Sequence, residues 1–172
     1  FADDKHLCYF KNGHALVKSG DRFGLIDEKG KKVIPTIFKG VGYFDELIPI
    51  TKDEIWGYCD EKANRKIDYQ FDMALNFNGN LAIVSKEGKM GLIDKSGEYK
   101  LMPEYDEILF VEDKFYKVKK NDKFGLLDKQ LNVLLPVKND ELILFSDVLI
   151  KTMNGEEMQY FNLNTKTYIE VE

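Results

Sequence analysis

Few side chains in this sequence are of the types that carry out nucleophilic or metal chemistry. There are two cysteines, Cys8 and Cys59, and two histidines, His6 and His14. A reactive thiolate needs an electropositive, partly open setting, and a zinc site needs three or four closely spaced ligands. These four residues meet neither requirement, and the sequence has no Gly-rich phosphate loop, EF-hand loop or Gly-x-Ser-x-Gly elbow. We therefore expect no catalytic residue, no metal site and no bound cofactor.

Four aspartates recur at regular intervals and are the remaining candidates for acid chemistry. They are Asp27, Asp60, Asp94 and Asp128. A recurring carboxylate could belong to a calcium ladder or to paired acids, but glycosidase acids converge as a single pair. These aspartates come one per repeat and begin turns such as Asp27-Glu28-Lys29-Gly30, where an Asp side chain accepts hydrogen bonds from turn amides. We predict that they cap turns.

The aspartates belong to a repeat that runs through the chain. Four copies share one pattern, Arg22-Phe23-Gly24-Leu25-Ile26-Asp27, Ile55-Trp56-Gly57-Tyr58-Cys59-Asp60, Lys89-Met90-Gly91-Leu92-Ile93-Asp94 and Lys123-Phe124-Gly125-Leu126-Leu127-Asp128. Their glycines are spaced 33, 34 and 34 residues apart, and a degenerate fifth copy surrounds Gln159. This regularity predicts one repeat domain over 1–172, with units at roughly 5–37, 38–70, 71–104, 105–138 and 139–172.

Alignment of the copies predicts short strands. Apolar positions alternate with a period of two, as in the columns Ala15, Ile48, Ala82, Tyr116, Ile150 and Val17, Ile50, Val84, Val118, Thr152. Two-residue turns rich in Gly, Asn and Asp separate the apolar runs, and such turns favour hairpins. Pro35, Pro103 and Pro136 are expected to end the last strand of their units. We predict an all-β chain in which each unit is an antiparallel meander of three or four strands.

The columns also predict the environments of the cysteines, of His14 and of the recurring glycines. Cys59 falls in an apolar column with Ile26, Ile93, Leu127 and Phe161, and Cys8 in one with Val41, Leu75, Leu109 and Ile143. Both thiols are therefore expected to be small buried hydrophobes, and His14 a partly covered residue at the start of a strand. The recurring glycines are expected to receive a neighbouring unit, with Phe23, Trp56, Met90 and Phe124 packed between units.

Composition excludes some classes of protein. The 172 residues are 44% hydrophobic and 13% aromatic, with a net charge of −5 and interleaved acids and bases. A nucleic-acid groove would need clustered Lys and Arg, and no apolar run is long enough to span a bilayer. The first residue is Phe1 rather than Met, which fits an exported or cell-envelope protein whose leader was removed, and also a trimmed cytosolic protein.

The repeat resembles the WG-repeat (KWG-repeat) family of bacterial proteins. Trp56-Gly57-Tyr58 is the copy most like the family pattern, and Val33-Ile34-Pro35 and Met102-Pro103-Glu104-Tyr105-Asp106 are similar to its last strand and tail. The resemblance covers nearly the whole chain, although Phe or Met replaces Trp in the other copies and Asp68 replaces Pro in the second. It implies repeated β units, no established catalytic residues and a role in protein interaction.

Units of this kind must stack, because none can bury its apolar faces alone. We expect an open β-solenoid-like array, with a five-unit propeller as the alternative. The expected function is that of a noncatalytic scaffold for protein–protein interaction, with a carbohydrate- or peptide-binding lectin-like module as the alternative. Candidate partner contacts are Tyr58, Tyr116, Tyr43, Lys119 and Lys120, since tyrosines anchor interfaces and the segment from Lys114 to Lys123 holds five lysines.

Overall fold

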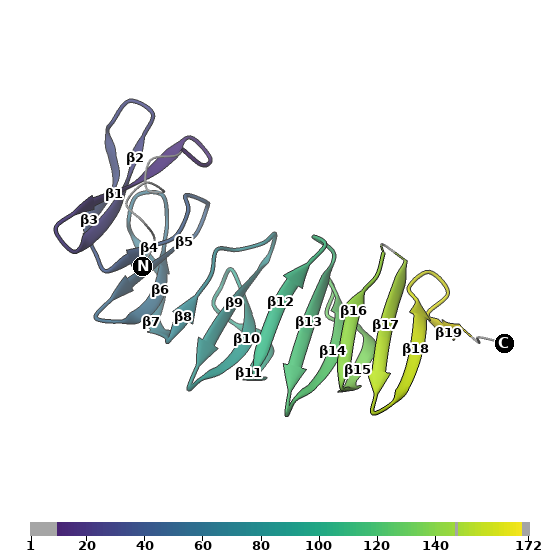
Figure 1. Cartoon of the computed structure of the whole chain (residues 1–172). Helices are drawn as coiled ribbons and strands as arrows, with labels where there is room; N and C mark the ends of the chain where they lie inside the picture. Colours follow the sequence, from purple (N-terminus) through teal and green to yellow (C-terminus); the bar gives the residue numbers. More distant parts are fainter. Residues whose placement is uncertain (1–9, 147, 170–172) are drawn as a thin grey trace. The chain divides into compact units, whose positions relative to one another are not determined.

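The chain is built from short antiparallel strands. The computed structural model describes residues 10–146 and 148–169, and this part of the chain contains nineteen strands and no helix (Figure 1). It therefore holds no helix that could cross a membrane. The strands form five separate sheets, in each of which neighbours in the sheet are consecutive in the chain. The predicted all-β array of tandem meanders is confirmed.

The strands are assigned as follows. The first sheet contains β1 (His14–Ser19), β2 (Arg22–Asp27) and β3 (Lys32–Phe38). The second contains β4 (Gly40–Val41), β5 (Ile48–Lys52), β6 (Ile55–Cys59) and β7 (Arg65–Phe71). The third contains β8 (Met73–Ala74), β9 (Leu81–Lys86), β10 (Lys89–Asp94) and β11 (Tyr99–Tyr105). The fourth contains β12 (Glu107–Val111), β13 (Phe115–Lys120), β14 (Lys123–Asp128) and β15 (Val133–Asn139). The fifth contains β16 (Glu141–Leu144), β17 (Leu149–Asn154), β18 (Glu157–Asn162) and β19 (Thr167–Ile169).

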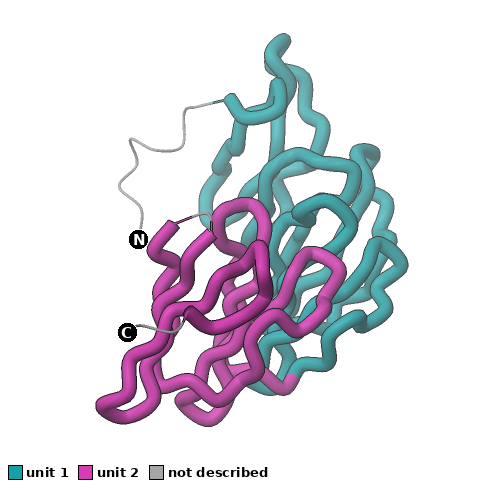
Figure 2. Tube along the Cα trace, turned by 90° about the vertical axis from the view of Figure 1, so that its right-hand side faces the viewer, with its two compact units in different colours: residues 1–103 teal, residues 104–172 magenta. Residues whose placement is uncertain are grey.

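The chain divides into two compact units, residues 1–103 and 104–172 (Figure 2). In the first unit, one buried cluster joins Leu25, Ile34 and Phe38 of the first sheet to Ile48, Ile50 and Cys59 of the second. Another joins the second sheet to the third, and in the second unit a cluster joins the fourth sheet to the fifth. Each of these clusters therefore draws its side chains from two consecutive sheets, as expected for stacked repeats.

The recurring glycines lie against the third long strand of their own sheets, so the expectation of contact with a neighbouring unit was wrong. A Cβ built on Gly24 would lie 2.4 Å from the carbonyl oxygen of Ile34, and one on Gly91 would lie 2.6 Å from that of Leu101. The register between β2 and β3 shifts on both sides of Leu25, which marks a bulge in β3. The glycine leaves room for the displaced backbone.

The prolines lie within these bulged strands rather than at their ends, which corrects a second expectation. Pro35 lies inside β3, Pro103 inside β11 and Pro136 inside β15, and each strand continues beyond its proline. All three strands are at the edge of their sheet in the strand order. Proline is tolerated there because one side of an edge strand needs no ladder hydrogen bond.

The recurring aspartates cap turns, as predicted. Oδ1 of Asp27 accepts hydrogen bonds from the backbone N–H groups of Lys29 and Lys31, at 2.9 and 2.8 Å. Equivalent pairs of bonds are made by Asp60, Asp94 and Asp128. The side-chain hydrogen bond from Asn64 leads the interactions that lower the pKa of Asp60 to about 2.

Three further aspartates, each directly after the last strand of a sheet, accept hydrogen bonds from the backbone of a hairpin. Oδ2 of Asp72, after β7, accepts a hydrogen bond from the backbone N–H of Gly88 in the β9–β10 hairpin, at 3.1 Å. The same kind of bond joins Asp106 to Asn121 and Asp140 to Gly155, both at 2.7 Å. Asp106 is the last residue of the tail motif that resembles the WG repeat. Within the compact units, the Asp72 carboxylate thus links the second sheet to the third, and the Asp140 carboxylate links the fourth to the fifth.

Replacement of a recurring glycine should destabilise the chain. Gly91→Val would place three carbon atoms where backbone atoms of residues 101–103 already lie within about 3.0 Å of a built Cβ. We expect the free energy of unfolding to fall by about 1–3 kcal/mol, measured by urea denaturation. Met90→Val, one residue earlier on the same strand, is the control. An unchanged free energy of unfolding for Gly91→Val would contradict this account of the glycine column.

Two buried threonines should respond to the same substitution with opposite signs. The hydroxyl of Thr51 donates to the carbonyl oxygen of Ile55 at 3.1 Å, whereas the Thr152 hydroxyl has no hydrogen-bond partner among the described residues. Both residues are buried. Because an unpartnered buried hydroxyl costs free energy, Thr152→Val should raise the free energy of unfolding by about 1 kcal/mol and Thr51→Val should lower it by a similar amount. A loss of stability in both variants would show that Thr152 is bonded.

The capping aspartates should make stability depend on pH in the acid range. The pKa of Asp60 is about 2 in the folded chain against an ordinary value of 3.8, so its stabilisation is complete above about pH 4 and is lost as the pH falls through 2. In Asp60→Asn the amide oxygen can still cap the turn, as Oδ1 of Asn162 does in the fifth sheet. We expect this variant to fold at pH 7 and to lose less stability than the parent chain between pH 4 and pH 2. Equal losses would exclude Asp60 as a source of acid sensitivity.

Candidate functional site

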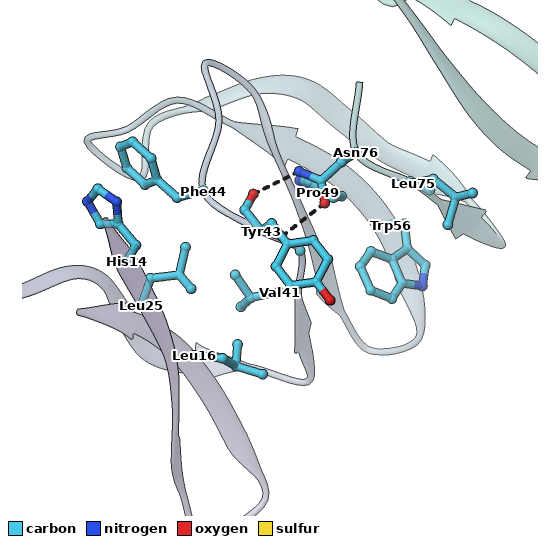
Figure 3. Close-up of a pocket in the computed structure, with 12 residues that line it drawn as sticks. His14, Leu16, Leu25, Val41, Tyr43, Phe44, Pro49, Trp56, Leu75 and Asn76 are labelled. Atoms are coloured by element: carbon cyan, nitrogen blue, oxygen red, sulfur yellow. Dashed lines mark hydrogen bonds between the residues drawn. The ribbon is translucent and has the colours of Figure 1, made fainter. Parts of the chain in front are cut away.

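An apolar pocket lies in the first compact unit (Figure 3). Its volume is about 340 Å³. The walls come from β1 and β2 of the first sheet, from β4, β5, β6 and the loop after β4 of the second, and from the end of β8 and the loop after it. The lining residues are His14, Leu16, Leu25, Val41, Gly42, Tyr43, Phe44, Pro49, Trp56, Ala74, Leu75 and Asn76.

On one side of the pocket, the side-chain amide of Asn76 forms two hydrogen bonds with the backbone of Tyr43. Asn76 donates from Nδ2 to the carbonyl oxygen of Tyr43 at 2.7 Å, and its Oδ1 accepts from the backbone N–H of Tyr43 at 2.9 Å (Figure 3). Gly42 makes this approach possible, because a Cβ at that position would lie 2.3 Å from Cγ of Pro49 and 2.7 Å from Oδ1 of Asn76. The loop carrying Tyr43 is therefore anchored to the third sheet through its backbone.

His14 and Phe44 form a second wall. Their rings are stacked, with centroids 3.5 Å apart and planes 11° from parallel. Nδ1 of His14 is 2.7 Å from the carbonyl oxygen of Asn12, and Nδ2 of Asn12 donates to the carbonyl oxygen of Phe44 at 2.9 Å. Both ring positions are thus supported by neighbouring backbone, and His14 is the partly covered strand-start residue that was predicted.

The mouth of the pocket presents apolar side chains to solvent. Tyr43 and Leu75 are each 46% exposed although they line the cavity. Nζ of Lys11 lies 3.8 Å from the centroid of the Tyr43 ring. The carbonyl oxygen of Leu75 accepts a 2.7 Å hydrogen bond from the hydroxyl of the buried Tyr58. Rigid support beneath an exposed apolar rim is a common property of protein-binding surfaces.

Two of the five predicted partner contacts are core residues, and this corrects the prediction for them. Tyr58 is fully buried and its ring lies 5.1 Å from that of Phe77. Tyr116 is 3% exposed and packs on Phe110 at 4.9 Å. Burial raises the pKa of both phenols. Both rings pack against other side chains inside the chain, so neither is accessible as an anchor for a partner.

The other three predicted contacts are accessible. Tyr43 lies at the mouth of the pocket, which makes it the one predicted contact placed at this site. Lys119 and Lys120 belong to β13 in the second compact unit, where Lys119 pairs with Asp122 at 2.8 Å and Lys120 pairs with Glu104. The structure does not test whether any of them meets a partner, so that role stays a prediction.

The cysteine and histidine candidates do not form a reactive centre in the described part of the chain. Cys59 is fully buried, as predicted, and burial, with a smaller contribution from Asp60, raises the pKa of its thiol to about 12. A thiol with this pKa is protonated at neutral pH and is a poor nucleophile. Cys8 and His6 lie outside the described residues. The described residues contain no group of three or more His, Cys, Asp or Glu side chains that could hold a metal ion.

The sequence contained a signal for the pocket that the column analysis did not use. Leu16 and Pro49 line the cavity and occupy the same column of the repeat as Ile83, whereas the fourth and fifth units have Lys117 and Lys151 there. An apolar column that becomes charged halfway along a repeat array distinguishes the units that can form an apolar cavity. Asn76 is likewise the one polar member of its column in units two to five, which also holds Gly42, Phe110 and Leu144.

Solved structures with similar folds come from proteins of low sequence identity. A eukaryotic initiation factor matches 93% of this chain with a TM-score of 0.54 and 13% identity, and Hsv2 of Kluyveromyces lactis matches 92% with 0.50 and 9%. A chain in a Saccharomyces cerevisiae structure of dbp5 bound to nup159 and gle1 matches 87% with 0.51 and 9%. The match spans 52%, 58% and 55% of those chains, about half of their length. At such identity the likeness concerns the fold alone.

No curated protein matches the chain in sequence. The model of the WG containing repeat matches it three times in succession, at residues 23–53, 56–89 and 90–124. These matches include the copies whose glycines accommodate the bulged edge strands and whose aspartates cap the following turns. The chain belongs to the family of proteins with the WG containing repeat.

Proposed function

We propose that the chain is a noncatalytic scaffold for protein–protein interaction, and that the apolar pocket in its first compact unit binds a side chain of a partner's peptide segment. The observation that carries this proposal is the exposed apolar rim of Tyr43 and Leu75 above a cavity with supported walls. Interfaces concentrate their binding free energy in such places, where a partner's apolar side chain is desolvated by an already ordered surface.

The polar chemistry of the pocket favours a peptide over a carbohydrate. Asn76 already has its amide engaged in both directions by the backbone of Tyr43. The remaining lining is almost entirely apolar and contains no Asp, Glu, Lys or Arg side chain. A sugar would bring many hydroxyl groups that need hydrogen-bond partners, whereas an apolar amino-acid side chain needs none.

The chemistry of the titratable groups supports a binding role over a catalytic one. A general acid that works near neutral pH needs a raised carboxyl pKa, but a hydrogen bond from Asn64 lowers the pKa of Asp60 and one from Lys100 lowers that of Asp94. These two carboxylates are therefore stabilised in their charged form.

A selection with displayed random peptides tests the proposal. Immobilised chain should enrich peptides that contain an apolar anchor residue, and Leu75→Glu should weaken their binding by about tenfold or more, because a charge would enter the apolar rim. Binding of synthetic versions of the enriched peptides would be measured by fluorescence polarisation.

Leu109→Glu is the matched control for this selection. Leu109 belongs to the same column of the repeat and is 45% exposed, but it lies in the fourth sheet and does not line the pocket. Peptides that bind both glutamate variants as well as the parent chain would contradict a role for the pocket. Retention of the chain on a glycan array, abolished by Leu75→Glu, would instead assign the pocket to a carbohydrate.

A further inference from the structure

The tryptophan of the pocket also lines a second depression. Trp56, on β6, forms one wall of the apolar pocket and also borders a shallow cavity lined by Lys39, Thr51, Asp53 and Glu54. The two cavities therefore share the Trp56 side chain as a common wall. A partner that fills the apolar pocket can reach the second cavity by passing over this ring.

The second depression carries an excess of negative charge. Asp53 and Glu54 are exposed at the tip of the β5–β6 hairpin, and no ion pair to either is found among the described residues. Lys39, the basic residue in its lining, pairs with Asp21, which also lies 3.5 Å from Arg22. The lining thus holds two carboxylates and one ammonium group beside Trp56.

The backbone of these two acidic residues has an unfavourable conformation. Asp53 and Glu54 have φ angles of +52° and +69°, in the left-handed region. The hairpins at the same place in the other units contain Gly or Asn, which adopt such angles more easily, in the pairs Gly20-Asp21, Glu87-Gly88, Asn121-Asp122 and Gly155-Glu156. Each of those pairs has one acidic residue.

We propose that the apolar pocket and the second depression together select a partner segment in which a lysine or arginine lies close in sequence to the apolar anchor residue. The inference rests on the proposed function, because the anchor occupies the pocket already described. The basic group lies between the carboxylates of Asp53 and Glu54 and the face of Trp56. The carboxylates attract a cation by their negative charge, and the indole ring attracts it through the π electrons of its face.

Trp56 provides the measurement, since it is the one tryptophan of the chain. Three synthetic peptides that lack Trp and Tyr would be titrated while the tryptophan emission is followed: Ser-Lys-Phe-Lys-Ser, Ser-Ser-Phe-Ser-Ser and Ser-Glu-Phe-Glu-Ser. We expect all three to change the emission at sufficient concentration. The affinity should fall in the order in which they are named, by about three- to tenfold per step at low ionic strength, and the differences should shrink with added salt.

Substitution of both acids tests the effect of the negative charge without changing the residues that line the apolar pocket. In the double variant Asp53→Asn, Glu54→Asn the hairpin keeps residues that tolerate a positive φ, so the chain should fold and should bind the serine peptide as before. Its preference for the lysine peptide over the serine peptide should be lost. Glu87→Asn, in the hairpin of the third sheet, is the control and should leave the preference unchanged.

The outcomes distinguish this inference from the function on which it rests. Tryptophan emission that responds to none of the peptides would contradict binding at the pocket itself. Equal affinity for the lysine and serine peptides would overturn the proposed basic preference alone. A preference that survives in the double variant would place the recognition of the basic residue elsewhere on the chain.

Discussion

The burial of sheet faces against one another is the interaction on which the rest of the structure depends. The second sheet shows this most fully, because Ile48, Ile50 and Cys59 pack towards the first sheet while Leu47, Ile67 and other side chains pack towards the third. A single meander cannot cover such surfaces with its own residues. The edge bulges, turn caps and aspartate links described above all serve to place these faces at the right separation, and the pocket forms where three successive sheets leave space at one end of their contact.

The Trp-Gly-Tyr triplet of the second unit has a different physical task at each residue. Trp56 borders the surface cavities, Gly57 gives room to the backbone of residues 67 and 68, and Tyr58 is buried with its hydroxyl bonded to the carbonyl oxygen of Leu75. The last of these bonds couples the core to the site, since Leu75 stands on the rim of the pocket. Because side chains alternate across a strand, Trp56 and Tyr58 share one face and Gly57 lies on the other, and the partly buried Trp56 packs against the cluster that contains Tyr58.

The repeat made much of the fold predictable from sequence. Columns of apolar residues gave the strands, the burial of Cys59 and the turn role of Asp60, because each inference was supported by several equivalent positions. The partner contacts were less predictable, since tyrosine has both an apolar ring and a polar tip. Tyr58 shares its column with Leu25, Leu92 and Leu126, which favours burial. The pocket is lined by residues of three successive repeat units, and a column shows which of its members are apolar but not which repeat units are in contact.

The aspartate links also determine how the chain would respond to tension. Within each compact unit, consecutive sheets are joined by apolar contacts and by bonds such as that from Gly88 to Asp72, while in the described part of the chain no ladder of strands crosses from one sheet to the next. A force applied along the backbone would therefore detach one meander before the next is disturbed. Each rupture would release a segment of about 34 residues, which extends to roughly 115 Å. The length of the chain would then increase in discrete steps.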